Sequence, residues 1–322
     1  MNTLLITDTH FGIKQNSHTW FKFQSKFIYE QIIPLIKEKN IKHIIHLGDV
    51  FDSRATISTF IIQKTYEMFK ELASLVESID IIAGNHDYYS PVSDDICALN
   101  VIFESIKNIN IHSKAICVDG VNLYVPWYQW LDENIRKNLP EIIEDNNIEN
   151  IFTHADIFNP DDKEFIKGLE CNVFSGHMHT PKIKKGMFNL GSCYSLSFSD
   201  CNHSRGVYIY DGEHLERVVN NSSINFWRIY NDEIFNENKW KPEDYIEIYI
   251  SQKNLIRDIY LAEIERLSKI YKNLTIIPQD DSNNVSTMEF GNYDILDITR
   301  NMIPEELREK YEKVISQISP AV

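Results

Sequence analysis

The sequence predicts an α/β protein, because short apolar runs of strand length alternate with longer amphipathic segments over the first two thirds of the chain. The runs are rich in Ile, Leu and Val, and each ends abruptly in a polar cluster, which is typical of buried strands. They lie at residues 4–6, 44–45, 79–82, 151–152 and 173–174. Alternating strands and helices indicate a layered α/β domain.

Two helices are predicted between the early strands. Trp20, Phe23 and Phe27 recur at helical spacing, and the pattern continues past Gln31 with Pro34 as an expected kink. A second apolar stripe with spacings of three and four runs through residues 57–76. Core packing is the default interpretation of that stripe.

The pattern changes after about residue 212. Residues 245–250 alternate as in a half-exposed strand, a helical pattern covers residues 255–270, and another apolar run follows at 274–277. This order predicts a small βαβ unit.

A last helix is expected near the end of the chain, where Pro304 precedes two glutamates and an apolar stripe. The sequence therefore predicts three parts: residues 1–212, a smaller domain at 213–290 and a helical segment at 291–322.

Composition excludes several classes of protein. Of 322 residues, 43% are hydrophobic and 25% are charged, which are ordinary globular values and exclude disordered and fibrous chains. No apolar run approaches the ~18 residues of a membrane span, and the N-terminal run lacks the features of a signal peptide. We expect a cytoplasmic protein without a membrane partner, in the host cytoplasm if the source is viral.

Cysteine usage and net charge narrow the chemistry further. Five cysteines form no CxxC pair, which argues against a disulfide framework and a thiolate zinc site. The formal net charge is −15. A broad basic face for nucleic acid is therefore not expected, and a phosphate-bearing substrate must be attracted locally.

Polar clusters follow five of the predicted strands. Ligands of open α/β sheets bind at the carboxyl ends of strands, so the fold can bring these clusters together. Carboxylate, amide and imidazole groups without thiolates favour Mn, Fe or Zn. Two aspartates facing two divalent ions leave a formal surplus of about +2, which can hold a phosphodiester. The candidate ligands are Asp8, His10, Asp49, Asn85, His154, His177 and His179.

Two further residues are candidates for catalysis. His86 adjoins Asn85 without being needed as a ligand, so we expect it to act as the general acid or to stabilise the transition state. Asp87 is expected to orient it. Arg54, just past the Asp49 loop, could reach a substrate phosphate, and an exposed salt bridge is the alternative reading.

Taken in order, these signatures resemble the calcineurin-like metallophosphoesterases. The resemblance implies a two-sheet β-sandwich flanked by helices and a pair of divalent ions. It implies that one ion is held by Asp8, His10, Asp49 and His179, and the other by Asp49, Asn85, His154 and His177.

Finer features resemble the SbcD branch of that family, and in particular phage recombination endonuclease subunits. The segment at residues 48–52 and the Gly-Ser-x-Tyr pattern at residues 191–194 carry this resemblance. It implies Mn²⁺-dependent exonuclease and single-strand endonuclease action on DNA in recombination and repair, with Mg²⁺, Fe²⁺ and Zn²⁺ as other possible metals. Ser192 and Tyr194 become candidate substrate contacts.

The same resemblance implies partners. The domain at 213–290 would contact DNA, the segment at 291–322 would dock on an SbcC-type coiled-coil ATPase, and the helix at 57–76 would contribute to a homodimer interface.

Two departures and two rival functions accompany this interpretation. Asp52 stands where other relatives carry histidine, and His154 lacks the glycine often found before it. A phosphoprotein phosphatase or a small-substrate phosphodiesterase would use the same metals. Against a phosphatase, the loop reads Asp52-Ser53-Arg54 rather than Asp-Arg-Gly.

Overall fold

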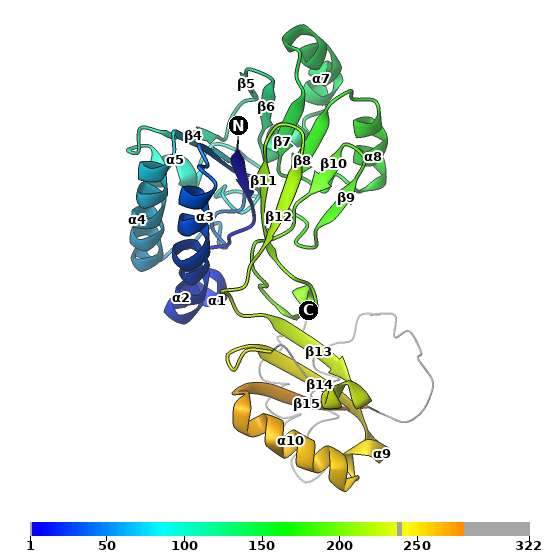
Figure 1. Cartoon of the computed structure of the whole chain (residues 1–322). Coiled ribbons are helices and arrows are strands. Elements are labelled where there is room, and N and C mark those ends of the chain that lie inside the picture. Colours follow the sequence, from blue (N-terminus) through cyan, green and yellow to red (C-terminus); the bar gives the residue numbers. More distant parts are fainter. Residues whose placement is uncertain (1, 237–239, 280–322) are drawn as a thin grey trace, which may run out of the picture. The chain divides into compact units, whose positions relative to one another are not determined.

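The computed structural model describes residues 2–236 and 240–279. It contains two six-stranded sheets flanked by helices and one three-stranded sheet (Figure 1). The predicted α/β class and the two-sheet sandwich are confirmed. The expected helix within residues 291–322, and the end of the expected domain at 280–290, lie outside the described residues.

The first sheet has the strand order β12-β11-β1-β2-β3-β4. Its strands are β1 (Thr3–Ile6), β2 (His43–His46), β3 (Ser78–Ile82), β4 (Ile109–His112), β11 (Gly206–Tyr210) and β12 (Leu215–Val219). Strands β1 to β4 are parallel, so their carboxyl ends share one edge, whereas β11 runs antiparallel to β1 and β12.

The second sheet has the order β5-β6-β7-β8-β10-β9. Its strands are β5 (Cys117–Asp119), β6 (Asn122–Val125), β7 (Asn150–Thr153), β8 (Asn172–Ser175), β9 (Lys182–Lys184) and β10 (Met187–Asn189). The four central strands are parallel, and the short strands β5 and β9 close the edges in antiparallel fashion.

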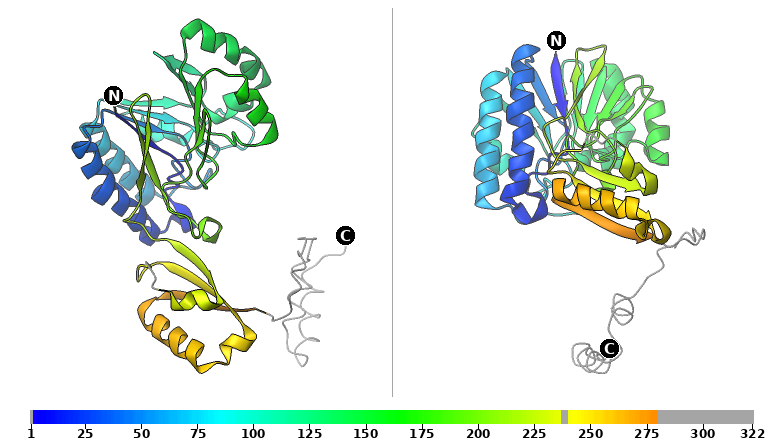
Figure 2. Two further views of the ribbon diagram at one scale, coloured as in Figure 1. Left: turned by 45° about the vertical axis from the view of Figure 1, so that its right-hand side comes forward. Right: turned by 60° about the horizontal axis from the view of Figure 1, so that its bottom comes forward.

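Helices cover the outer faces of both sheets. In Figures 1 and 2 the blue and cyan helices flank the first sheet and the green helices flank the second. The first group is α2 (His18–Phe27), the π-helical turn η1 (Ile28–Ile32), α3 (Ile33–Glu38), α4 (Thr59–Leu75) and α5 (Ala98–Phe103); the second is α6 (Trp127–Leu131), α7 (Glu133–Asn146) and α8 (Pro160–Lys167).

The expected kink at Pro34 takes the form of this π-helical turn. The turn ends at Ile32, and Pro34 then falls in the first turn of α3. The helix pattern therefore continues across the proline.

The sandwich is apolar on both faces of each sheet. One core lies between the first sheet and its helices, and a second lies between the second sheet and α7 and α8. A third core, with Leu5, Ile45, Phe152 and Phe174, lies between the two sheets. Strands buried on both faces explain why the sequence shows continuous apolar runs instead of strict alternation.

The third sheet contains the expected βαβ unit. Strands β14 (Tyr245–Ser251) and β15 (Asn273–Gln279) are parallel and are joined by α10 (Asp258–Ile270). The remaining elements are β13 (Phe226–Tyr230), η3 (Asn231–Phe235) and α9 (Gln252–Leu255). Because β12 still pairs within the first sheet, the change of sheet falls after Val219 and not at residue 212. The assignment of domains stays a prediction.

Among the described residues, the structure has no helix long and apolar enough to cross a membrane.

The stability of the sandwich should depend on a neutral His46. This residue of β2 is buried, its Nε2 lies 3.0 Å from Thr9 Oγ1, and its Nδ1 accepts a hydrogen bond from the Gly48 N–H. Burial lowers its pKa from 6.5 to about 3. The unfolded chain therefore binds a proton that the folded protein excludes, so stability present above pH 6.5 is lost as the pH falls towards 3.

We predict that His46→Asn flattens the decline of the unfolding free energy between pH 6.5 and 4, measured by urea denaturation. Each unit by which the pKa of His46 is lowered on folding costs about 1.4 kcal/mol of unfolding free energy at low pH, and the variant should remove this cost. The exposed His203 provides the control, since His203→Asn should keep the wild-type slope. Equal slopes in wild type and His46→Asn would contradict this account.

Candidate metal centre

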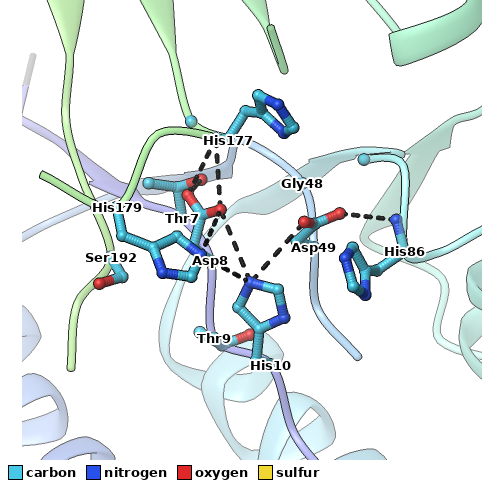
Figure 3. Close-up of polar contacts among 12 residues, drawn as sticks. Thr7, Asp8, Thr9, His10, Gly48, Asp49, His86, His177, His179 and Ser192 are labelled. Carbon is cyan, nitrogen blue, oxygen red and sulfur yellow. Dashed lines mark hydrogen bonds and ion pairs between the residues drawn. The ribbon is translucent and has the colours of Figure 1, made fainter. Parts of the chain in front are cut away.

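The expected metal ligands meet at one edge of the sandwich. They sit on the loops that follow β1, β2 and β3 of the first sheet and β7 and β8 of the second. Two groups have ligand atoms within 4.8 Å of one another: Asp8 with His10 and His179, and Asp49 with His154 and His177. Figure 3 shows Asp8, His10 and Asp49 facing one another across the centre.

In the first group the side chains converge on a small space. His10 Nε2 lies 3.3 Å from His179 Nε2 and 3.8 Å from Asp8 Oδ1. The distance from Asp8 Oδ1 to His179 Nε2 is 3.9 Å.

The second group closes around Asn85. Its Oδ1 lies 3.1 Å from His154 Nε2 and 3.0 Å from His177 Nδ1. Asp49 Oδ2 lies 3.3 Å from His154 Nε2 and 3.7 Å from His10 Nε2, so this carboxylate stands between the two groups. That is the position expected of a bridging ligand.

This donor set fits two divalent cations. It consists of carboxylate, amide and imidazole groups, which suit Mn, Fe or Zn. Two imidazole nitrogens, those of His10 and His179, face each other at 3.3 Å. If neither nitrogen carries a hydrogen, the two lone pairs oppose each other, whereas a cation between the groups would engage both. These residues could therefore hold the metal pair that the sequence predicts.

The charges in the centre are strongly coupled. Burial opposes the charged forms of His10 and His154. Contacts with Asp52 and Asp8 nevertheless raise the pKa of His10 to about 10. Asp49 likewise raises the pKa of His154 to about 9, against its burial. Despite burial, the contact with His10 lowers the pKa of Asp8 to about 2. A histidine ligates a cation only when neutral, so metal binding would release protons from His10 and His154.

Glycines let the loops approach one another. A Cβ on Gly48 would lie 2.5 Å from His154 Nδ1, and one on Gly84 would lie 2.3 Å from Asp49 Oδ1. A Cβ on Gly176 would lie 2.0 Å from Thr7 Oγ1. The glycines that precede Asp49, Asn85 and His177 are thus required by close packing between loops.

The backbone is strained where it carries candidate ligands. Asp8, His10, Asp49 and His177 all have positive φ angles, of 52°, 42°, 53° and 75°. L-residues rarely adopt this region, and such strain clusters at functional sites. The surrounding hydrogen bonds hold these conformations, and Gln24 contributes by donating to the carbonyls of Thr9 and His10.

Asp87 has a different role from the one expected. Its buried carboxylate accepts hydrogen bonds from the backbone N–H groups of Gly84, Asp49, Val50 and Phe51. Burial and the charge of Asp49 raise its pKa to about 7. Because this carboxylate faces the neighbouring backbone, the geometry does not support the expectation that it orients His86.

His86 is instead held by the loop that follows β2 and carries Asp49 and Asp52. Its backbone N–H donates to Asp49 Oδ1, and its Nδ1 lies 2.6 Å from the carbonyl oxygen of Asp52. A carbonyl only accepts hydrogen bonds, so Nδ1 must carry a hydrogen and Nε2 is the nitrogen left for chemistry. Asp52 also places its carboxylate 3.5 Å from His10 Nδ1.

A cavity of about 350 Å³ adjoins these residues. It is lined by His10, Ile13, Lys14, Asp49, Asp52, Asn85, His86, His177, His179, Leu196, Ser197 and Ser199. Five of the seven candidate ligands therefore face a common space with His86 and one lysine, and this space can admit a substrate; Asp8 and His154 lie behind the lining.

The expected substrate contacts do not line this cavity. Ser192 and Tyr194 are buried; the Ser192 hydroxyl donates to the Tyr194 carbonyl, and the Tyr194 ring packs on Phe27. They are corrected to core positions. Arg54 is half-buried and is not part of the lining either.

Sequence reasoning missed three residues near the centre. Lys14 lines the cavity, the Trp127 ring packs 4.8 Å from that of His177, and Asp200 lies beside His179. Lys14 follows His10 closely and could have been noted as a local basic residue. Trp127 and Asp200 belong to no metal-ligand pattern, so only the fold reveals them.

We predict that Gly176→Ala abolishes metal binding, because its Cβ would collide with Thr7 and lie 2.8 Å from Asp8 Oδ2. Equilibrium dialysis against Mn²⁺ measures the number of bound ions. Gly168→Ala is the control, since its Cβ would make only an ordinary contact, 3.4 Å from the Phe165 carbonyl. Wild-type Mn²⁺ binding by Gly176→Ala would show that the loops do not need this close approach.

One curated protein, a phage exonuclease subunit, is similar in sequence to this chain. Exonuclease subunit 1 of Enterobacteria phage T4 is 24% identical to it over 241 residues, which is 69% of this chain and 69% of that protein.

Three solved structures are similar to the chain at low TM-scores. An archaeal phosphodiesterase is 16% identical, with 68% of this chain and 99% of that chain covered and a TM-score of 0.37. A dimetal phosphatase from Danio rerio is 11% identical, with 69% of this chain and 99% of that chain covered and a TM-score of 0.46. Nuclease MPE of Pseudomonas putida is 13% identical, with 67% of this chain and 87% of that chain covered and a TM-score of 0.34.

The calcineurin-like phosphoesterase family model matches residues 1–181, which include every candidate ligand. Together with the two-sheet fold and the paired groups of ligands, this match identifies the chain as a member of the calcineurin-like phosphoesterase family.

Proposed function

We propose that this chain is a metal-dependent nuclease subunit that hydrolyses phosphodiester bonds in DNA, in recombination and repair. The observation that carries the proposal is the pair of ligand groups on either side of Asp49, open to one cavity. The likeness to a phage exonuclease subunit supports DNA as the substrate. It also favours exonuclease action. Endonuclease action on single strands is proposed from the SbcD-like features of the sequence.

Seven residues would hold the metal pair. In this proposal Asp8, His10, Asp49 and His179 bind one ion, and Asp49, Asn85, His154 and His177 bind the other, with Mn²⁺ as the metal. Two such ions act as Lewis acids towards phosphoryl oxygens and lower the pKa of water.

His86 is proposed as the general acid. The Asp52 carbonyl fixes its ring through Nδ1, so a proton on Nε2 can be delivered to the departing alkoxide. The contact between its backbone N–H and Asp49 keeps the residue beside the centre.

Lys14 is proposed to bind a phosphate of the DNA backbone. It belongs to α1 (Ile13–Asn16), in which Lys14, Gln15 and Asn16 have φ angles of 55°, 58° and 61°. Three consecutive left-handed residues are costly, and such strain is a sign of function. Lys14 is the one lysine or arginine in the cavity lining, which suits local attraction of a polyanion by an acidic protein.

Partners belong to the same proposal. Because the phage relative is named as a subunit, we propose that this chain works with a partner subunit. The resemblance to SbcD-type sequences is the reason for proposing an SbcC-type ATPase as this partner and a homodimer. Residues 291–322, the segment proposed to dock on the ATPase, lie outside the described residues.

The first test is hydrolysis of end-labelled single-stranded and duplex DNA with Mn²⁺. We expect cleavage that a chelator stops and that Asp49→Asn abolishes, because this carboxylate lies between the ligand groups. The alternatives are a small-substrate phosphodiesterase and a phosphoprotein phosphatase. Cleavage of a chromogenic diester or a phosphoprotein, without any cleavage of DNA, would favour them instead.

We predict that His86→Gln lowers kcat for DNA by about 10²- to 10⁴-fold, the usual contribution of a general acid. The effect on a p-nitrophenyl diester should be much smaller, because p-nitrophenolate leaves without protonation. Mn²⁺ stoichiometry should stay at the wild-type value. Equal losses with both substrates would argue against proton donation by His86.

We predict that Lys14→Ala raises KM for DNA and reduces the salt dependence of DNA binding by about one counterion. Hydrolysis of the chromogenic diester should change little, since that substrate has no neighbouring phosphate. Lys22→Ala, an exposed lysine on α2 that does not line the cavity, is the matched control. Identical salt slopes for wild type and Lys14→Ala would exclude the contact.

A further inference from the structure

A buried ion pair adjoins the metal centre on the side of His179. Asp200, at the end of the 3₁₀ turn η2 (Phe198–Asp200), and Arg205 are each 2% exposed. Arg205 Nη2 lies 3.1 Å from Asp200 Oδ1 and also donates to the Asp200 carbonyl. The Leu196 N–H donates to Asp200 Oδ2 at 2.8 Å, which fixes the carboxylate on its other side.

This pair contacts both the ring and the backbone of His179. Asp200 Oδ1 lies 3.7 Å from His179 Nδ1, and Arg205 Nη1 donates to the His179 carbonyl. The Ser192 N–H donates to the same carbonyl at 3.0 Å. The two nitrogens of this imidazole therefore face different groups: Nε2 faces Asp8 and His10, and Nδ1 faces Asp200.

His179 needs such support more than its neighbours in the same group. Its side chain is 32% exposed, whereas those of His10 and Asp8 are 4% and 0% exposed. Asp8 is buried and also accepts hydrogen bonds from Thr7 Oγ1 and the His177 N–H, whereas the His179 ring is partly open to solvent. A carboxylate at Nδ1 would hold the hydrogen on that nitrogen and leave the Nε2 lone pair for a cation.

Stability is a weak explanation for this pair. Removing two charges from water is costly, and buried ion pairs can often be replaced by apolar residues without loss of stability. Here Arg205 and the Leu196 N–H make three polar contacts with Asp200, and Arg205 makes a fourth with the carbonyl of His179. All four contacts hold groups that lie beside a candidate ligand.

We infer that Asp200 and Arg205 are positioning residues that orient His179 as a metal ligand. The inference rests on the proposed metal centre. Asp200 fixes the tautomer and the angle of the ring, while Arg205 holds Asp200 and the His179 backbone in register. Neither residue lines the cavity, so neither is expected to touch the substrate.

The test measures Mn²⁺ binding by the full chain. Titration calorimetry gives the affinities, and electron paramagnetic resonance shows whether the bound ions are magnetically coupled. Wild type should bind two ions that are magnetically coupled. Asp200→Asn should weaken one of the two binding events by about 10- to 100-fold, the usual effect of losing the partner of a ligating histidine. The other event should be unchanged, and the coupled signal should be lost at limiting Mn²⁺.

Asp162→Asn is the matched control. Asp162 is also a buried carboxylate paired with an arginine: it lies 2.7 Å from Arg136 and accepts a hydrogen bond from Trp130 Nε1. Its replacement should lower thermal stability and leave both Mn²⁺ events intact. Equal weakening of Mn²⁺ binding by both variants would assign the effect to general destabilisation and overturn the inference.

A double-mutant cycle separates positioning from a direct effect. If Asp200 acts through His179, Asp200→Asn should not weaken Mn²⁺ binding further once His179→Ala is present. Additive losses would contradict positioning. Arg205→Lys, which keeps the charge but loses the planar fork of donors, is the second variant should Asp200→Asn not fold, and it should weaken the same event.

The outcomes distinguish this inference from the proposed function. A wild-type chain that binds no Mn²⁺ would overturn both. Two ions bound with equal affinity by wild type, Asp200→Asn and Arg205→Lys would keep the metal centre and overturn the positioning role alone.

Discussion

The buried carboxylate of Asp87 is the contact on which the metal centre most depends. It binds the backbone of its own loop at Gly84 and that of the next loop at Asp49 and Val50. The contact fixes the candidate bridging ligand Asp49 relative to the Asn85 loop. An unmade hydrogen bond is expensive in a buried setting, so the two loops have little freedom to separate.

Electrostatics explains how an acidic protein can use such a site. Inside the centre the negative charges of Asp8 and Asp49 interact favourably with protonated His10 and His154. Attraction for a polyanion need not come from the whole surface, because a cation pair and one lysine can supply it locally. The net charge of −15 is therefore compatible with the proposed polyanionic substrate.

Much of the centre could be predicted from the sequence, because parallel strands place their carboxyl ends at one edge and each end carries a polar motif. Contacts between distant loops could not be predicted in this way. Asp87 reads as a neighbour of His86, yet the turn directs it to the Asp49 backbone. Ser192 and Tyr194 read as a substrate loop, yet they pack inward. Lys14 could be noted only as a basic residue near His10, and Asp200 belongs to no metal-ligand pattern, so the fold is needed to place both.

Each group of ligands draws on both sheets: Asp8, His10 and Asp49 come from the first, and His154, His177 and His179 from the second. The first sheet also receives its last strands, β11 and β12, after the second sheet in chain order. During synthesis, therefore, the N-terminal half of the chain holds only part of each group. A cation held by either group would therefore need residues from both sheets, and the last residue of each group, His179 or His177, follows β8 in the second half of the chain.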